Sequence, residues 1–153
     1  MGRLLTLGVV CAIAVSSAIG AEAAPACPVS TLSPIKGRTS FNIGTTQLAV
    51  SLHSGATYVA VPEGRPGSAF VEKSGRIRIK LGWLSPTGGP RVTGRRLDAP
   101  AARLRVDVGV KSFVPGGGEF YPSHLYSPTI GCWRVTASNA KSRLTFTVRV
   151  VRQ

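Results

Sequence analysis

The sequence predicts an all-β domain of about eight short strands, and three observations support this prediction. Apolar and polar residues alternate with a period of two in several segments, most clearly where Ile77, Ile79 and Leu81 alternate with basic residues. Turns rich in glycine and proline separate these segments, as in residues 85–90. No stretch shows a convincing helical period, so the strands are expected to pack as a sandwich or barrel.

The same pattern places the other strands. In chain order, the expected strands cover residues 47–61 as a hairpin around 53–55, then 69–72, 76–81, 91–97, 103–110, and a hairpin of 132–137 with 144–151. Within 103–110, the residues expected to face the core are Leu104, Val106, Val108 and Val110. Trp133 lies early in the penultimate strand with Val135 and Ala137 on its side, which favours an immunoglobulin-like sandwich around a buried tryptophan.

The chain begins with the three parts of a secretory signal. Arg3 is followed by an apolar run over 4–19 and by Ala21-Glu22-Ala23, a cleavage site of small residues. We therefore expect a signal peptide over 1–23, an irregular lead-in over 24–46 and a single β-sandwich domain over 47–153. No later apolar run is long enough to cross a bilayer, so the protein is expected to be periplasmic or extracellular. An uncleaved membrane anchor and lipidation of Cys27 remain alternatives.

The chain is strongly basic, with a formal net charge of +13 from 19 Lys and Arg against 6 Asp and Glu. Such a charge attracts polyanions, including anionic envelope polymers. Alternation places the basic residues of two strands on solvent faces, and the candidate polyanion-binding residues are Arg76, Arg78, Lys80, Arg103 and Arg105. Aromatic residues scarcely interleave with them, which argues against a specific nucleic-acid site. The alternative is that these residues serve only solubility.

Cysteine usage predicts one disulfide. Cys11 lies in the predicted signal, which leaves Cys27 and Cys132 to pair in an oxidising compartment. Closing a loop of about 105 residues would stabilise the fold by roughly 4 to 5 kcal/mol at most.

Groups that carry catalysis are few. The histidines are His53 and His124, and the sequence has no metal-ligand spacing or phosphate loop, so neither a metal nor a cofactor is expected. Gly131-Cys132-Trp133-Arg134 nevertheless resembles the Ser-His-Gly-Cys-x-Arg signature of L,D-transpeptidases, with Thr129 and Ile130 replacing Ser-His. That resemblance implies Cys132 as a nucleophile, with His124 as the available base. It is the enzymatic alternative to a non-enzymatic envelope or extracellular module.

Residues 111–129 are expected to form a long loop that carries most of the aromatic residues of this half of the chain. These are Phe113, Phe120, Tyr121 and Tyr126. Two interpretations remain open: the aromatics form a contact surface, or they fold back and cover one end of the sandwich.

The C-terminal half resembles an uncharacterised family of exported bacterial proteins. The matching residues are Thr93-Gly94-Arg95-Arg96-Leu97-Asp98-Ala99-Pro100, Leu104-Arg105, Pro128-Thr129, Gly131-Cys132-Trp133, Val135-Thr136 and Leu144-Thr145-Phe146, and Cys27-Pro28-Val29 resembles that family's mature start. Arg134 departs from the pattern, because an acid is common there. The resemblance implies export and β architecture but no activity. Asp98 is expected to accept from Arg95 or Arg96 at a structural corner.

Overall fold

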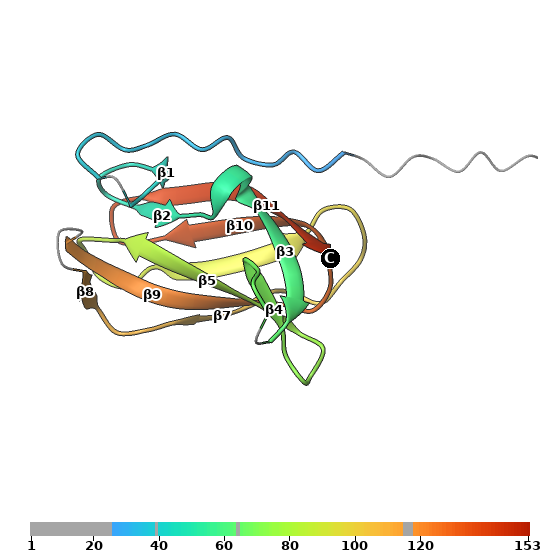
Figure 1. Cartoon of the computed structure of the whole chain (residues 1–153). Coiled ribbons are helices and arrows are strands. Elements are labelled where there is room, and N and C mark those ends of the chain that lie inside the picture. The colour runs from blue at the N-terminus through green and yellow to red at the C-terminus, as the bar shows by residue number, and fades with distance from the viewer. Residues whose placement is uncertain (1–25, 39, 64, 115–117) are drawn as a thin grey trace, which may run out of the picture.

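The protein is built from short strands in one mixed sheet (Figure 1). The computed structural model describes residues 26–153 except 39, 64 and 115–117, so the predicted signal peptide lies outside the described residues. The strands are β1 (Ile43–Gly44), β2 (Ala49–Ser51), β3 (Thr57–Pro62), β4 (Ala69–Val71), β5 (Ile77–Leu84), β6 (Arg91–Arg96), β7 (Arg105–Val108), β8 (Ser112–Val114), β9 (Gly118–Ser127), β10 (Gly131–Ser138) and β11 (Arg143–Arg152). A single turn of 3-10 helix, η1 (Ser54–Ala56), precedes β3. The predicted all-β class is confirmed.

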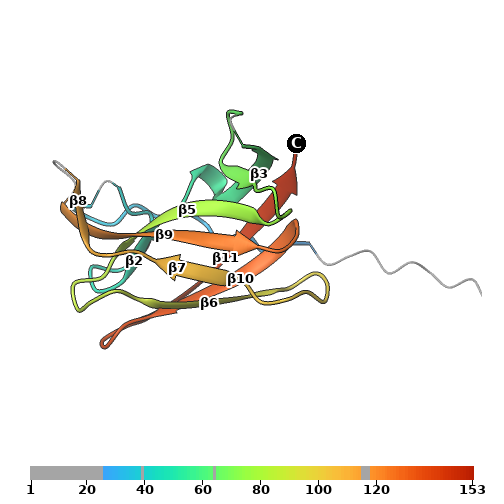
Figure 2. The same cartoon turned by 90° about the horizontal axis from the view of Figure 1, so that it is seen from below.

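The sheet has two arms. In one arm β3, β11, β10 and β6 lie side by side, and in the other β5 pairs with β2 and β9, which in turn pairs with β7 and β8. β4 joins the arms, because it pairs with β3 in parallel and with β5 in antiparallel orientation. Figure 2 shows the arm of β5, β9 and β7 beside that of β11, β10 and β6.

The inner faces of the two arms share one hydrophobic core. Trp83 of β5 and Phe146 of β11 have ring centroids 5.9 Å apart, and Trp133 is fully buried between its neighbours. Each indole finds a hydrogen-bond acceptor, since Trp83 Nε1 donates to Ser123 Oγ (2.8 Å) and Trp133 Nε1 to the Thr129 carbonyl (3.2 Å). Burial of these large rings supplies much of the hydrophobic stabilisation.

The predicted strands over 69–72 and 76–81 and the predicted C-terminal hairpin are present. β4 and β5 pair through Val71 and Ile77, and along β5 the residues Ile77, Ile79 and Leu81 are buried, as the alternation predicts. β10 pairs with β11 over its whole length around the predicted turn, with Val135 opposite Phe146.

The predicted hairpin over 47–61 is wrong. β2 pairs with β5, whereas β3 pairs with β11 and β4, so the two strands belong to different arms. The reason is the connection between them: Gly55 (φ 68°) and Ala56 (φ 48°) are consecutive residues in the left-handed region, and the chain crosses to the other arm there.

The predicted long loop over 111–129 is also wrong, because most of it forms β8 and β9. β9 is central to its arm and pairs with β5, β7 and β8. Phe120 and Tyr121 pack against buried clusters, whereas Phe113 is 66% exposed. The strand predicted over 103–110 is shorter than expected, since β7 ends at Val108 and Val110 is 86% exposed rather than buried.

The lead-in segment packs along the part of the β11 edge that β3 leaves unpaired. Ser30 N donates to the Thr147 carbonyl (3.0 Å), and Thr147 N donates to Ser30 Oγ (2.8 Å). Farther on, Phe41 is buried beside Leu84. None of the helical structure described from residue 26 onward is long and apolar enough to cross a membrane.

Candidate functional site: two basic faces of the sheet

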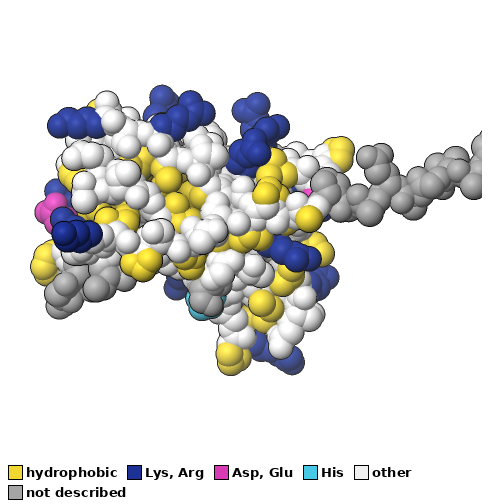
Figure 3. Space-filling model, turned by 90° about the horizontal axis from the view of Figure 1, so that it is seen from above, with side chains coloured by type: hydrophobic (Ala, Val, Ile, Leu, Met, Phe, Trp, Pro, Cys, Tyr) yellow, Lys and Arg dark blue, Asp and Glu magenta, His cyan; other side chains and the backbone are white. Residues whose placement is uncertain are grey.

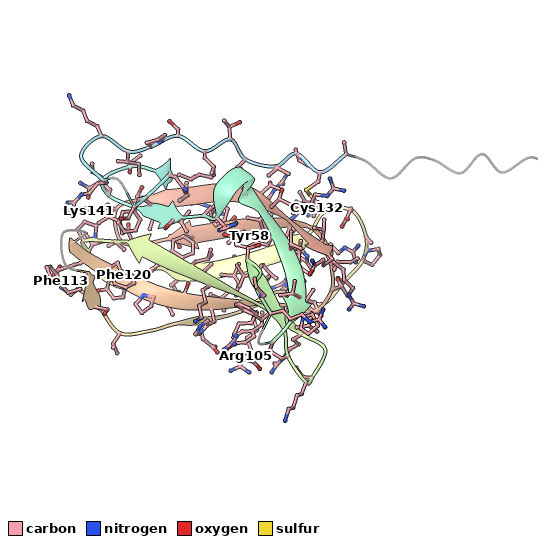
Figure 4. All side chains as sticks on the ribbon, viewed as in Figure 1. Tyr58, Arg105, Phe113, Phe120, Cys132 and Lys141 are labelled. Carbon is pink, nitrogen blue, oxygen red and sulfur yellow. A yellow bond between two sulfur atoms is a disulfide. The ribbon has the colours of Figure 1, made fainter. Side chains whose placement is uncertain are left out.

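The predicted polyanion-binding residues lie mainly on the outer face of β5, β9 and β7. Arg78 and Lys80 point outward from β5, and Arg105 does so from β7. Across β9 the register places Tyr126 between Arg78 and Arg105. The structure therefore brings together most of the residues that the alternation selected. Figure 4 labels Arg105 on this side of the molecule.

This face is largely neutralised by acids, and we call it the paired face. Its ion pairs are Arg76–Glu72 (3.7 Å), Arg78–Glu63 (2.8 Å), Arg78–Glu72 (3.9 Å) and Arg105–Asp107 (3.2 Å). The guanidinium groups of Arg76 and Arg105 also lie 5.4 and 5.6 Å from the centroid of the Tyr126 ring. Their charges are thus satisfied within the protein. Lys80 and Arg103 make no ion pair in the part of the chain that the structure describes.

A second basic face lies on the other arm, on the outer side of β6, β10 and β11. We call it the arginine face. Its outward residues are Arg91, Thr93, Arg95, Arg134, Thr136, Ser138, Arg143, Thr145 and Arg149. Figure 3 shows several groups of Lys and Arg side chains projecting along one margin of the molecule, at the top of that view.

The register arranges these residues in rows across the three strands. Thr93, Thr136 and Thr145 form one row, in which the Oγ1 atoms of Thr136 and Thr145 are 3.1 Å apart. In the next row Arg134 lies directly opposite Arg95. Directly opposed residues have Cβ atoms about 4.5–5.5 Å apart, and like charges at that position destabilise a sheet.

The arginine face differs from the paired face in its ion pairs. Among the residues described, none of its five arginines, Arg91, Arg95, Arg134, Arg143 and Arg149, makes an ion pair. This face was not among the predicted binding residues, although the sequence carries a signal for it. Arginine and threonine alternate in 91–95, 134–136 and 143–145, and the hairpin pairing brings these segments side by side.

The structure pairs Cys27 with Cys132, as predicted. The S–S distance is 2.09 Å and the Cα atoms are 5.4 Å apart. His124 lies on β9 in the other arm, where it pairs across strands with Lys80 and Asp107. The structure does not bring His124 to Cys132. Burial, followed by the nearby charges of Arg78 and Lys80, lowers the pKa of His124.

Beside the disulfide, the segments that carry the family resemblance converge on one corner. Arg96 Nε donates to Asp98 Oδ1 (2.6 Å), which confirms the expected acceptor, and Cys132 N donates to Asp98 Oδ2 (3.1 Å). Arg96 Nη1 donates to Thr129 Oγ1 (3.1 Å). The hydrogen bond from Arg96, with that from Cys132 N, holds the pKa of Asp98 below its usual value. Asp98 therefore ties the end of β6 to the start of β10.

Comparison with known proteins assigns no family to this arrangement. No family model matches the sequence, and no curated protein matches it.

Proposed function

We propose that this protein is an exported, non-enzymatic module with an immunoglobulin-like sandwich, and that its arginine face binds anionic polymers. The observation that supports this is the contrast in pairing. The acids of the described chain pair with Arg76, Arg78, Arg96, Arg105 and Lys111. The arginine face is left with like charges directly opposed, an arrangement that an external anion would stabilise.

The shape of this face favours a linear polymer over a small ligand. Arg91 and Arg95 are four residues apart on β6, roughly 13 Å along the strand, and three strands span about 10 Å. Guanidinium groups bind phosphate, sulfate or carboxylate groups through two parallel hydrogen bonds, and the threonine row adds neutral hydroxyls. The outward residues include no aromatic side chain for base stacking. Anionic envelope polymers are the class of partner that this chemistry fits.

Retention of the disulfide-bonded protein on heparin across a salt series tests the proposal. We expect a variant with Arg95→Ser, Arg134→Ser and Arg143→Ser to elute at clearly lower salt than wild type. The matched control, with Arg76→Ser, Arg78→Ser and Arg105→Ser, removes the same charge from the paired face and should lose less. Equal losses would show that net charge alone governs retention.

The enzymatic alternative of a Cys132 nucleophile remains a proposal with its own test. A nucleophilic thiol must be free, whereas Cys132 is 1% exposed and bonded to Cys27. Rapid labelling of Cys132 by a thiol-reactive probe without reductant would favour the enzyme over the binding module.

A further inference from the structure

One edge of β5 has a gap between its two neighbouring strands. β2 pairs with β5 at residues 82–84 and β4 at 77–78, so within the described structure no strand pairs with residues 79–81 on this edge. The ladder between β2 and β5 ends before Leu52, because the Asn42 side chain hydrogen-bonds to both the backbone N–H and the carbonyl of Leu52. Leu52 N donates to Asn42 Oδ1 (2.9 Å), and Asn42 Nδ2 donates to the Leu52 carbonyl (2.7 Å).

This gap presents backbone hydrogen-bonding groups. Successive residues of a strand direct their N–H and C=O groups to opposite edges, so at least one residue of 79–81 directs both groups into the gap. Unpaired groups on a strand edge are a template for another extended chain. Because β2 and β4 occupy the two ends of the gap, a partner chain can pair with β5 only over the short stretch 79–81.

An open groove of about 670 Å³ lies over the gap. Its lining includes Phe70, Phe120, Lys80 and His124, and the ring of Phe120 lies against Gly82. Figure 4 labels two lining residues, Tyr58 beside η1 and Phe120 toward the β8 end of β9. The groove thus combines apolar walls with polar groups and has the size of a typical ligand site.

Charge in the groove selects the end of the chain. Lys80 makes no ion pair among residues 26–153 as described, and His124 lies directly across from it on β9. The pKa of His124 is lowered, so its imidazole is neutral near pH 7 and Lys80 supplies the local positive charge. A carboxylate is the complementary group.

We propose that this groove binds the carboxyl end of an extended peptide. The edge of β5 at residues 79–81 pairs with the peptide backbone, Lys80 binds the terminal carboxylate, and Phe70 and Phe120 contact apolar side chains. This site lies on the other arm from the arginine face and is independent of the function proposed there.

Titration of the ¹⁵N-labelled, disulfide-bonded protein tests the proposal. The probes are N-acetyl tripeptides with Ala, Val, Leu or Phe at the last two positions, offered as free acids and as C-terminal amides. Free acids should cause saturable shifts in residues 79–81 and His124, with the amides at least tenfold weaker. Lys80→Met should weaken binding of the acids about tenfold, whereas Lys73→Met, in the exposed β4–β5 turn, should not.

Three outcomes would overturn the proposal. They are no saturable binding by any free acid, equal binding of acid and amide, and shifts confined to the arginine face. A response to a neutral oligosaccharide such as chitotetraose, with none to the peptides, would assign the groove to sugars instead. Because the arginine face is not altered in these variants, failure here leaves the polymer-binding proposal intact.

Discussion

The two outer faces of the sheet carry similar numbers of basic residues but use them differently. On the paired face, Glu63, Glu72 and Asp107 lie within ion-pair distance of Arg76, Arg78 and Arg105. On the arginine face, Arg95 and Arg134 are directly opposed, and neither makes an ion pair in the described part of the chain. The difference teaches that the net charge of a strand does not identify a binding face. What matters is which charges the folded protein leaves unsatisfied.

The disulfide lies in the arm that carries the arginine face, and its removal should have the largest effect on the free energy of unfolding. The disulfide joins the lead-in segment to β10, two residues before Arg134, and closes a sequence separation of 105 residues. We expect Cys27→Ser with Cys132→Ser to lower the free energy of unfolding by up to roughly 4 to 5 kcal/mol. Urea denaturation of both proteins measures this. A loss below about 1 kcal/mol would show that the disulfide contributes little constraint.

A charge reversal on each face should have opposite effects on stability. Arg134→Glu places an acid opposite Arg95, so we expect a gain of about 0.2–1 kcal/mol in the free energy of unfolding. Binding to heparin should weaken roughly tenfold, because one anion contact is replaced by repulsion. Arg105→Glu, on the paired face, should instead destabilise the protein, because it puts two acids side by side. A loss of stability in Arg134→Glu would contradict the repulsion inferred for the arginine face.

Removing acids should convert the paired face into a second binding face. In a variant with Glu63→Gln, Glu72→Gln and Asp107→Asn, the arginines of the paired face lose their partners. We expect this variant to elute from heparin at higher salt than wild type, because more cations are free to bind. The single variant Glu119→Gln, which frees only Lys111, should change retention less. Unchanged elution of the triple variant would mean that pairing does not mask these arginines.

The smallest effect concerns pH and the Asp98 corner. The pKa of Asp98 is lower in the folded protein, so its contribution is fully present above the ordinary aspartate value of about 3.9 and is lost as pH falls through the folded value. Wild type should therefore lose more stability than Asp98→Asn when pH is lowered below about 4. Parallel losses in the two proteins would show that Asp98 does not carry this dependence.

Much of the fold could be predicted because the alternation of apolar and polar residues can be read within each strand. The alternation of β5 and the β10–β11 hairpin follow directly from side chains that alternate between core and solvent. β9 was missed because its pattern is inverted: the buried Ser123 and Ser127 are polar, while His124 and Tyr126 face outward. Ser123 is buried because its hydroxyl accepts from Trp83 Nε1, a partner 40 residues away.

The candidate site was less predictable, because it depends on contacts between residues that are distant in the sequence. Alternation identifies outward arginines, but not whether an acid from another strand reaches them. Glu63 is 15 residues from Arg78, and only the β3–β4 connection brings the two together. Arg95 and Arg134 are opposed only because β6 pairs with β10. Strand pairing, rather than any segment taken alone, decides which face remains charged.

The most direct test is to observe the arginine side chains during binding. In a titration of the ¹⁵N-labelled protein with inorganic polyphosphate at low salt, the Nε–H signals of each arginine report its own contacts. We expect the signals of the arginine face, including Arg95 and Arg134, to shift and saturate together, while those of Arg78 and Arg105 stay in place. Shifts concentrated on Arg78 and Arg105, or spread equally over both faces, would contradict the account.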